Sequence, residues 1–254
     1  MTGTALITGA SSGIGLELAK LHAQAGGDLV LVARREDALE ALASELTYSH
    51  GVSVQVVAVD LTQPDAAARV HDAAPHIDIL INNAGFGALR SFADQSLETQ
   101  LAMISLNVRA LTDLTHRYLA SMCAQGGGRI LNVASTAGFL PSPGMATYFA
   151  TKAYVVSFSQ ALAQELRGSG ITVTALCPGP VRTEFFDRAG MADLAVTRQA
   201  RDAKLTAAVG YKAMQAGRPL VFDDWRLGFL LGWVVPILPR RLVLWALQRS
   251  MQTR

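Results

Sequence analysis

The chain has 254 residues, a length at which an α/β fold often forms one domain. Hydrophobic residues make up 50% of it and charged residues only 17%, which excludes an intrinsically disordered chain. The formal net charge of +2 argues against a nucleic-acid-binding protein that depends on a strongly basic surface.

Short apolar runs alternate with helical stretches along the chain. Strands are expected at 5–8, 29–32, 52–59, 77–81, 129–133 and 171–176, with a short seventh at 220–222. Helices are expected at 14–25, 36–47, 64–74, 97–124 and 148–166, and the segment 183–215 is helical by pattern. Because the strands are apolar on both faces, the alternation predicts a parallel sheet covered by helices. The predicted fold is therefore α/β: a single-domain, Rossmann-like, doubly wound parallel sheet of six to seven strands with helices on both faces.

Residues 1–222 are expected to form this domain, and residues 223–254 an apolar, basic, helical tail. Two cysteines, Cys123 and Cys177, cannot make a disulfide framework, so a reducing, cytoplasmic setting is expected. The N-terminus has neither a basic region nor a long apolar run, so no signal peptide is expected. The five histidines show no ligand spacing with cysteines or carboxylates, and no metal site is predicted.

A glycine-rich loop, Thr8-Gly9-Ala10-Ser11-Ser12-Gly13-Ile14-Gly15, joins the first strand to the first helix. Glycines allow a tight turn and let the backbone approach a pyrophosphate, while the helix N-terminus offers unpaired N–H donors. The position of the loop between a strand and a helix is what this mechanism requires. The loop therefore predicts a dinucleotide-binding site.

The spacing Gly-x3-Gly-x-Gly, with Thr8 before it, resembles the short-chain dehydrogenase/reductase family. Asp60-Leu61, Asn82-Asn83-Ala84-Gly85 and Pro178-Gly179-Pro180-Val181-Arg182-Thr183 extend the resemblance over roughly residues 4–190, and Asn107, Ser135, Tyr148 and Lys152 match the family's catalytic tetrad in order. The resemblance implies a set of cofactor-binding residues: Thr8, Gly9, Ser11, Ser12, Gly13, Ile14, Gly15, Asp60, Leu61, Asn83, Ala84, Gly85, Tyr148, Lys152, Pro178, Gly179, Val181 and Thr183. It also implies a homo-oligomer, a dimer or a tetramer.

The end of the second strand distinguishes NADP from NAD. An acidic residue there accepts the ribose hydroxyls of NAD, whereas arginines bind the 2′-phosphate of NADP by charge-assisted hydrogen bonds. This chain has Arg34 and Arg35 there, with no carboxylate until Glu36. Solvated arginines that open a helix are the alternative, but basic charge at a helix N-terminus is unfavourable. NADPH is therefore the predicted cofactor, and NAD is less favoured.

Tyr148 and Lys152 are four residues apart, so both side chains leave one helix face. A nearby ammonium favours a phenolate, and we expect Lys152 to lower the tyrosine pKa from its usual value of about 10. Tyr148 would then exchange a proton with a carbonyl or alcohol oxygen, and Ser135 would hydrogen-bond the same oxygen. By resemblance, Asn107 holds a water that links Lys152 to solvent. Taken singly, each of these residues also fits an ordinary packing, surface or turn role.

The expected substrate wall is apolar, and core packing is an equal alternative for each of its residues. The candidates are Phe86, Phe139, Leu140, Phe185, Phe186 and Met191, together with the polar Ser135 and Tyr148. Apolar walls favour a hydrophobic carbonyl or alcohol over a sugar phosphate. The segment 183–215 is a candidate lid over that substrate.

The tail departs from the usual family ending. Residues 225–247 hold all three tryptophans, but the longest uncharged run, 227–239, is too short for the roughly 20 residues that span a bilayer. Three interpretations stay open: a helix pair packed on its own domain or on another subunit, a peripheral membrane contact with tryptophans at the interface, or a lid on a long-chain substrate.

The predicted function is an NADP(H)-dependent oxidoreductase that interconverts a ketone and a secondary alcohol. The expected substrate is a small hydrophobic carbonyl compound. We expect the reaction to run in the direction of reduction, with Tyr148 as the general acid. Two alternatives stand beside it: a nucleotide-binding regulatory protein without turnover, and a non-redox lyase or isomerase on the same fold. The tetrad argues against the regulatory protein, which would not need it.

Overall fold

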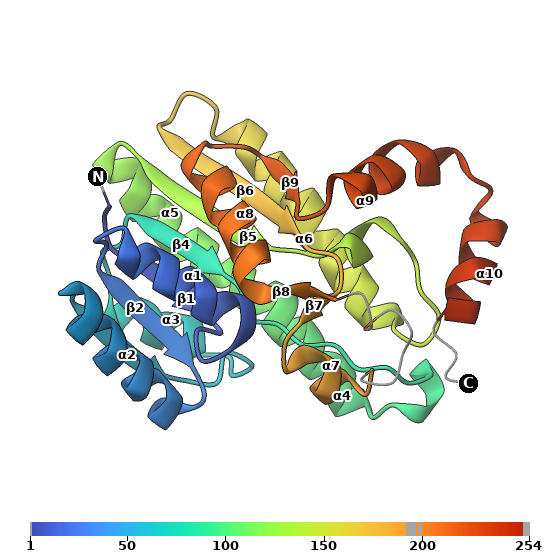
Figure 1. The fold of residues 1–254 in the computed structure, drawn as a ribbon, viewed down its shortest axis with the longest axis horizontal. Helices are drawn as coiled ribbons and strands as arrows, with labels where there is room; N and C mark the ends of the chain where they lie inside the picture. The colour runs from blue at the N-terminus through green and yellow to red at the C-terminus, as the bar shows by residue number, and fades with distance from the viewer. Residues whose placement is uncertain (1, 192–196, 198–199, 251–254) are drawn as a thin grey trace.

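The computed structural model describes residues 2–191, 197 and 200–250. Within these residues, seven strands form one parallel sheet, which confirms the predicted architecture (Figure 1). The strand order is β3-β2-β1-β4-β5-β6-β9. The strands are β1 (Ala5–Thr8), β2 (Leu29–Ala33), β3 (Val54–Ala58), β4 (Ile79–Asn82), β5 (Gly128–Val133), β6 (Ile171–Cys177) and β9 (Leu220–Phe222). The order reverses direction between β1 and β4, and ligands of such sheets bind at the carboxyl ends of the strands at this point.

Helices cover both faces of the sheet (Figure 1). The helices α1 (Gly13–Gln24), α2 (Glu36–His50) and α8 (Ala203–Gln215) pack on one face, and α3 (Ala66–Ala73), α5 (Leu111–Gln125) and α6 (Ala146–Glu165) pack on the other. Successive residues of β1 serve the two faces, since Ile7 lies in the first apolar cluster and Leu6 in the second. This two-sided burial explains why the strand sequences are apolar throughout.

The long helix predicted at 97–124 is not continuous. The helix α4 (Leu97–Ile104) is followed by a π-helical turn, η2 (Ser105–Ala110), before α5 begins at Leu111. A π-helical turn is a local change from i→i+4 to i→i+5 hydrogen bonding, and the prediction of one helix from the apolar pattern over 97–124 did not resolve it. Asn107 lies in this turn and is buried.

The prediction that 183–215 is helical throughout is wrong. The short helix α7 (Phe185–Ala189) follows β7 (Val181–Arg182), and β7 pairs with β8 (Arg201–Asp202) ahead of α8. This pairing is a long-range contact that helical periodicity cannot show. The part of the expected lid at 192–196 and 198–199 lies outside the described residues.

The tail leaves the sheet beside β9 and bends around one side of the molecule (Figure 1). It consists of α9 (Trp225–Phe229), a π-helical turn η5 (Leu230–Val234), a 3₁₀ turn η6 (Val235–Ile237) and α10 (Arg240–Ser250). Leu231 and Val243 are buried, whereas Trp225 and Trp233 are about three-quarters exposed, at 76% and 75%. The tail therefore packs inward with aliphatic side chains and presents tryptophans outward. Across the described ranges, we find no helix that combines the length and apolar character needed to cross a membrane.

Candidate active site

A cleft of about 870 Å³ lies at the carboxyl ends of the strands. Its walls come from the loops that follow β1, β2, β3, β4, β5 and β6, and from the tail. Of the predicted site residues, Thr8, Gly15, Asn107 and Phe139 do not line it, and all the others do. Most of the predicted site residues therefore line one continuous cleft.

The glycine-rich loop forms one wall of the cleft. Gly9 and Gly13 have φ values of +67° and +57°, a backbone conformation that side chains other than glycine rarely adopt. A Cβ on Gly15 would collide with the Gly9 carbonyl and the Asn83 amide, so this residue keeps α1 close to the loop. The Ser12 side chain does not cap α1. The first N–H groups of α1 are thus suited to an anionic group such as a pyrophosphate.

Thr8 and Asn83 hold the loop against the chain that follows β4. The Thr8 hydroxyl accepts hydrogen bonds from the backbone N–H groups of Asn83 and Ala84, both at 3.0 Å. The Asn83 amide donates to the carbonyl oxygens of Thr8, at 2.9 Å, and Gly9, at 3.2 Å. Thr8 is therefore a support of the cofactor loop from beneath, since it is buried and does not face the cleft.

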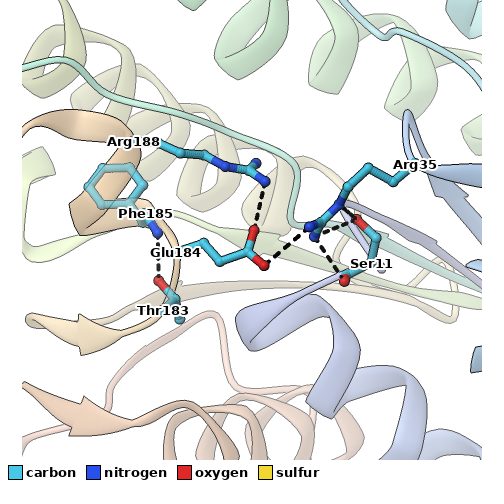
Figure 2. Close-up of polar contacts among 6 residues, drawn as sticks. All are labelled: Ser11, Arg35, Thr183, Glu184, Phe185 and Arg188. Atoms are coloured by element: carbon cyan, nitrogen blue, oxygen red, sulfur yellow. Dashed lines mark hydrogen bonds and ion pairs between the residues drawn. The ribbon is translucent and has the colours of Figure 1, made fainter. Parts of the chain in front are cut away.

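Charged side chains gather where β2 and β3 end. Arg34, Arg35 and Asp60 line the cleft there, and the Asp60 carboxylate accepts from the N–H and hydroxyl of Thr62 at 3.0 and 2.9 Å. Arg35 donates to the Ser11 carbonyl oxygen at 3.0 Å and forms an ion pair with Glu184 at 3.2 Å (Figure 2). Glu184 was not predicted from the sequence, because it lies 149 positions along the chain from its partner.

The three predicted reacting groups Ser135, Tyr148 and Lys152 line the same cleft. Ser135 precedes the 3₁₀ turn η3 (Thr136–Phe139), while Tyr148 and Lys152 are one turn apart on α6. The Lys152 Nζ donates to the Val133 carbonyl oxygen at 2.8 Å and lies 5.9 Å from the centre of the Tyr148 ring. A hydroxyl, a phenol and an ammonium group therefore share one buried space.

The expected lowering of the tyrosine pKa is wrong. Burial raises the pKa of Tyr148 to about 12, and a hydrogen bond with Ser135 offsets this only in part. Burial also lowers the pKa of Lys152 to about 8, although the nearby Cys177 works in the opposite direction. Removal from water therefore dominates both pKa values, and the Tyr148 hydroxyl is protonated at neutral pH.

Asn107 is buried and does not line the cleft, but it contacts Phe86, which does. Its amide nitrogen donates to the Phe86 carbonyl oxygen and the Thr151 hydroxyl, both at 3.0 Å, and its Oδ1 accepts from the Phe86 N–H at 3.1 Å. A Cβ on Gly85 would have Asn107 Oδ1 and Lys152 Nζ as its nearest neighbours, at 3.1 and 3.5 Å. Asn107 thus fixes the backbone beside Lys152, and its role in a water relay stays a prediction.

The substrate end of the cleft is apolar. Phe86, Leu140, Phe185, Phe186 and Met191 line it, as expected, and the Phe185 and Tyr148 ring centres are 5.3 Å apart. Phe139 lies elsewhere, with its ring centre 5.1 Å from that of Phe222, because adjacent residues at the end of η3 face different sides. The larger apolar lining residues that the sequence did not identify include Leu106, Met145, Phe149, Leu227, Leu230, Leu231 and Leu247. Four of these leucines come from the tail.

The loop after β6 carries Pro178, Gly179, Val181 and Thr183, all of which line the cleft. The buried carboxylate of Asp223 holds this loop, because its Oδ1 accepts from the Gly179 N–H at 2.9 Å and its Oδ2 accepts from the Thr206 hydroxyl at 2.9 Å. Asp223 begins the tail segment, so a single residue connects the tail to α8 and to the loop after β6.

We expect Asp223→Ala to lower the free energy of unfolding by about 2 to 3 kcal/mol, because it leaves the buried Thr206 hydroxyl and the half-buried Gly179 N–H without their acceptor. The neighbouring Asp224 is a matched control. Its carboxylate only caps α9 through the Arg226 N–H, so Asp224→Ala should cost about 1 kcal/mol. Denaturant unfolding of both variants measures the difference, and equal losses would contradict the role given to Asp223.

Comparison with known proteins identifies the family. The model of the family described as short chain dehydrogenase matches residues 3–193. Sulfoacetaldehyde reductase 2 of Chromohalobacter salexigens is 38% identical over 191 residues, which cover 73% of this chain and 75% of that protein. A short-chain dehydrogenase from Sphingobium yanoikuyae in complex with NADPH is 36% identical and superimposes with a TM-score of 0.85, over 99% of this chain and 98% of that chain. The bulky-bulky ketone specific alcohol dehydrogenase from Comamonas testosteroni is 32% identical, with a TM-score of 0.78 over 93% and 95% of the two chains.

The chain belongs to the short-chain dehydrogenase family. It is an oxidoreductase that acts on CH–OH and C=O groups with a nicotinamide cofactor, as the sequence predicted. The glycine cradle and the uncapped start of α1 fit the phosphates of that cofactor. No cluster of three or more His, Cys, Asp or Glu side chains suited to a metal ion occurs in the described part of the chain. Oligomer formation, and contact of residues 225–247 with a membrane or another subunit, stay predictions.

Proposed function

We propose that the protein uses NADPH to reduce a bulky apolar ketone to a secondary alcohol, with Tyr148 as the proton donor. One observation carries the proposal: a single cleft has arginines at one end and a phenol among apolar side chains at the other. Arg34 and Arg35 supply the positive charge that a 2′-phosphate requires. Phe86, Leu140 and Phe185 surround the side on which the substrate would lie.

The tail favours a large substrate over a small one. Leu227, Leu230, Leu231 and Leu247 extend the apolar wall beyond the residues that the family model covers. The similarity to an alcohol dehydrogenase specific for bulky-bulky ketones supports the same substrate class. These contacts support a role of the tail in substrate binding, close to the third interpretation drawn from the sequence, a lid on a long-chain substrate.

The chemistry follows from the protonation states of two groups. When bound, the nicotinamide cofactor supplies the hydride. The Tyr148 hydroxyl is protonated at neutral pH and donates its proton to the carbonyl oxygen as negative charge develops there. The Ser135 hydroxyl donates a hydrogen bond to the same oxygen and holds it beside Tyr148. The Lys152 ammonium, fixed by Val133, stabilises the phenolate that remains after the transfer.

The test is a set of initial rates across carbonyl compounds that differ in apolar size, with NADPH and NADH compared at each. Burial of one methylene is worth about 0.8 kcal/mol, so kcat/KM should rise about fourfold per added methylene until the cleft is filled. Sulfoacetaldehyde is the small polar control, and it should react more slowly than an aryl alkyl ketone.

Each part of the proposal has its own contrary outcome. Faster reduction of sulfoacetaldehyde would overturn the apolar substrate, and equal kcat/KM with NADPH and NADH would overturn the cofactor preference. Binding of NADPH without turnover of any carbonyl compound would favour the nucleotide-binding regulatory protein.

A further inference from the structure

Four residues from three separate segments meet at the arginine end of the cleft (Figure 2). Arg35, at the end of β2, forms an ion pair with Glu184, just before α7, at 3.2 Å. The second oxygen of Glu184 accepts from Arg188 of α7 at 2.6 Å. Arg35 also donates to the Ser11 carbonyl oxygen at 3.0 Å and to its hydroxyl at 3.3 Å. Ser11, Arg35, Glu184 and Arg188 all line the cleft.

Arg35 makes two kinds of contact in this cluster, one with the Ser11 carbonyl oxygen and one with the Glu184 carboxylate. The Ser11 carbonyl oxygen accepts from Arg35 at 3.0 Å and places the guanidinium beside the phosphate loop. The Glu184 carboxylate has two arginine partners, so it can lose one and keep the other. Both side chains of the Arg35–Glu184 pair are partly exposed, at 42% and 45%, so solvent or a ligand can reach the contact.

A phosphate and a carboxylate are competitors for the same guanidinium. Both accept paired hydrogen bonds from arginine, and the phosphate carries the larger negative charge near neutral pH. The 2′-phosphate of a cofactor therefore has to replace the Glu184 carboxylate in order to bind Arg35. A cofactor without that phosphate has nothing to exchange with Glu184.

We infer that Glu184 determines cofactor specificity by competing with the 2′-phosphate for Arg35. This inference rests on the proposed use of NADPH. A 2′-phosphate displaces Glu184, which keeps its contact with Arg188, whereas a cofactor without the phosphate leaves the Arg35–Glu184 pair intact. Glu184 thus reduces the advantage of NADPH over NADH that the arginines provide.

The exchange also connects the two ends of the cleft. Glu184 directly precedes Phe185 and Phe186, which line the substrate end. The Phe185 N–H donates to the Thr183 hydroxyl at 3.3 Å, so the backbone on both sides of Glu184 is held in place (Figure 2). Release of Glu184 from Arg35 therefore removes one contact that connects the glycine-rich loop, through Arg35, to the substrate wall. The substrate wall would therefore be less restrained with NADPH bound than with NADH bound.

The experiment compares two probes that differ only in the 2′-phosphate, 2′,5′-ADP and 5′-AMP, by titration calorimetry of the full chain. Glu184→Gln should bind 2′,5′-ADP about fivefold more tightly than the wild type, because an exposed ion pair of ordinary strength no longer competes. Its affinity for 5′-AMP should stay within a factor of two of the wild type. Asp187→Asn is the matched control, since Asp187 is exposed on α7 and does not line the cleft. It should change neither affinity.

The same substitution in an Arg35→Met background isolates the mechanism. There the gain for 2′,5′-ADP should vanish, because the contested guanidinium is gone. Equal tightening of both probes would show a general charge effect and would overturn the inference. Weaker binding of 2′,5′-ADP by Glu184→Gln would also overturn it, because Glu184 would then position Arg35 for the phosphate. Wild-type protein that binds both probes equally would instead contradict the proposed use of NADPH.

Discussion

Replacement of Tyr148 by Phe is expected to lower kcat/KM for carbonyl reduction by about 10²- to 10⁴-fold, the range that a positioned general acid contributes. The phenyl ring keeps the packing against Phe149 and Phe185, whose ring centres lie 6.0 and 5.3 Å away. Only the hydroxyl and its hydrogen bond with Ser135 are removed. The dissociation constant of NADPH, measured by fluorescence titration, should therefore change little while turnover is lost.

Tyr118→Phe is the matched control for this experiment. The Tyr118 side chain is fully buried and its hydroxyl donates to the Ala74 carbonyl oxygen at 2.8 Å, far from the cleft lining. Its loss should cost about 1 kcal/mol of stability and leave kcat unchanged. If Tyr148→Phe retains turnover, or if Tyr118→Phe loses as much activity, Tyr148 is not the proton donor.

Local patterns were sufficient for the sheet and the phosphate loop. The strand bounds of β1 and β9 agree with the prediction to the residue, because runs such as Ala5–Thr8 are buried on both faces and need no information about their neighbours. Gly9 and Gly13 adopt the positive φ values that the loop requires. These features depend on residues close together in the chain, so the sequence contains them directly.

Features that depend on distant contacts could not be predicted in the same way. Phe139 and Leu140 are both apolar and adjacent, yet only Leu140 lines the main cleft. The partners of Arg35 and Asp223 lie 149 and 44 positions away along the chain. The direction of the Tyr148 pKa shift was also missed, because spacing shows that a lysine is near but not how deeply both groups are buried. Burial is a property of the assembled fold.

Burial of the Lys152 ammonium group is expected to lower the stability of the folded protein. Lys152 is 6% exposed, and burial lowers its pKa from 10.5 to about 8. At neutral pH the folded protein therefore holds a charged ammonium in a site that disfavours charge. We expect Lys152→Met to raise the free energy of unfolding at pH 7 by about 3 kcal/mol, since the pKa of Lys152 falls from 10.5 to about 8 on folding and each pKa unit corresponds to about 1.4 kcal/mol. The same variant should lose activity.

The pH dependence separates this cause from a simple packing gain. Below pH 8 the lysine is protonated in both the folded and the unfolded state, so the full cost of burying its charge is present. Between pH 8 and 10.5 the unfolded state binds more protons than the folded state, and wild-type stability rises relative to that of Lys152→Met. The advantage of the variant should therefore be greatest below pH 8 and shrink as the pH approaches 10.5. Denaturant unfolding across this range measures the difference, with Lys20→Met as the control because Lys20 is partly exposed and paired with Glu45 at 3.1 Å. An advantage that stays constant or grows with pH would show that Lys152 stores no electrostatic cost in the folded protein.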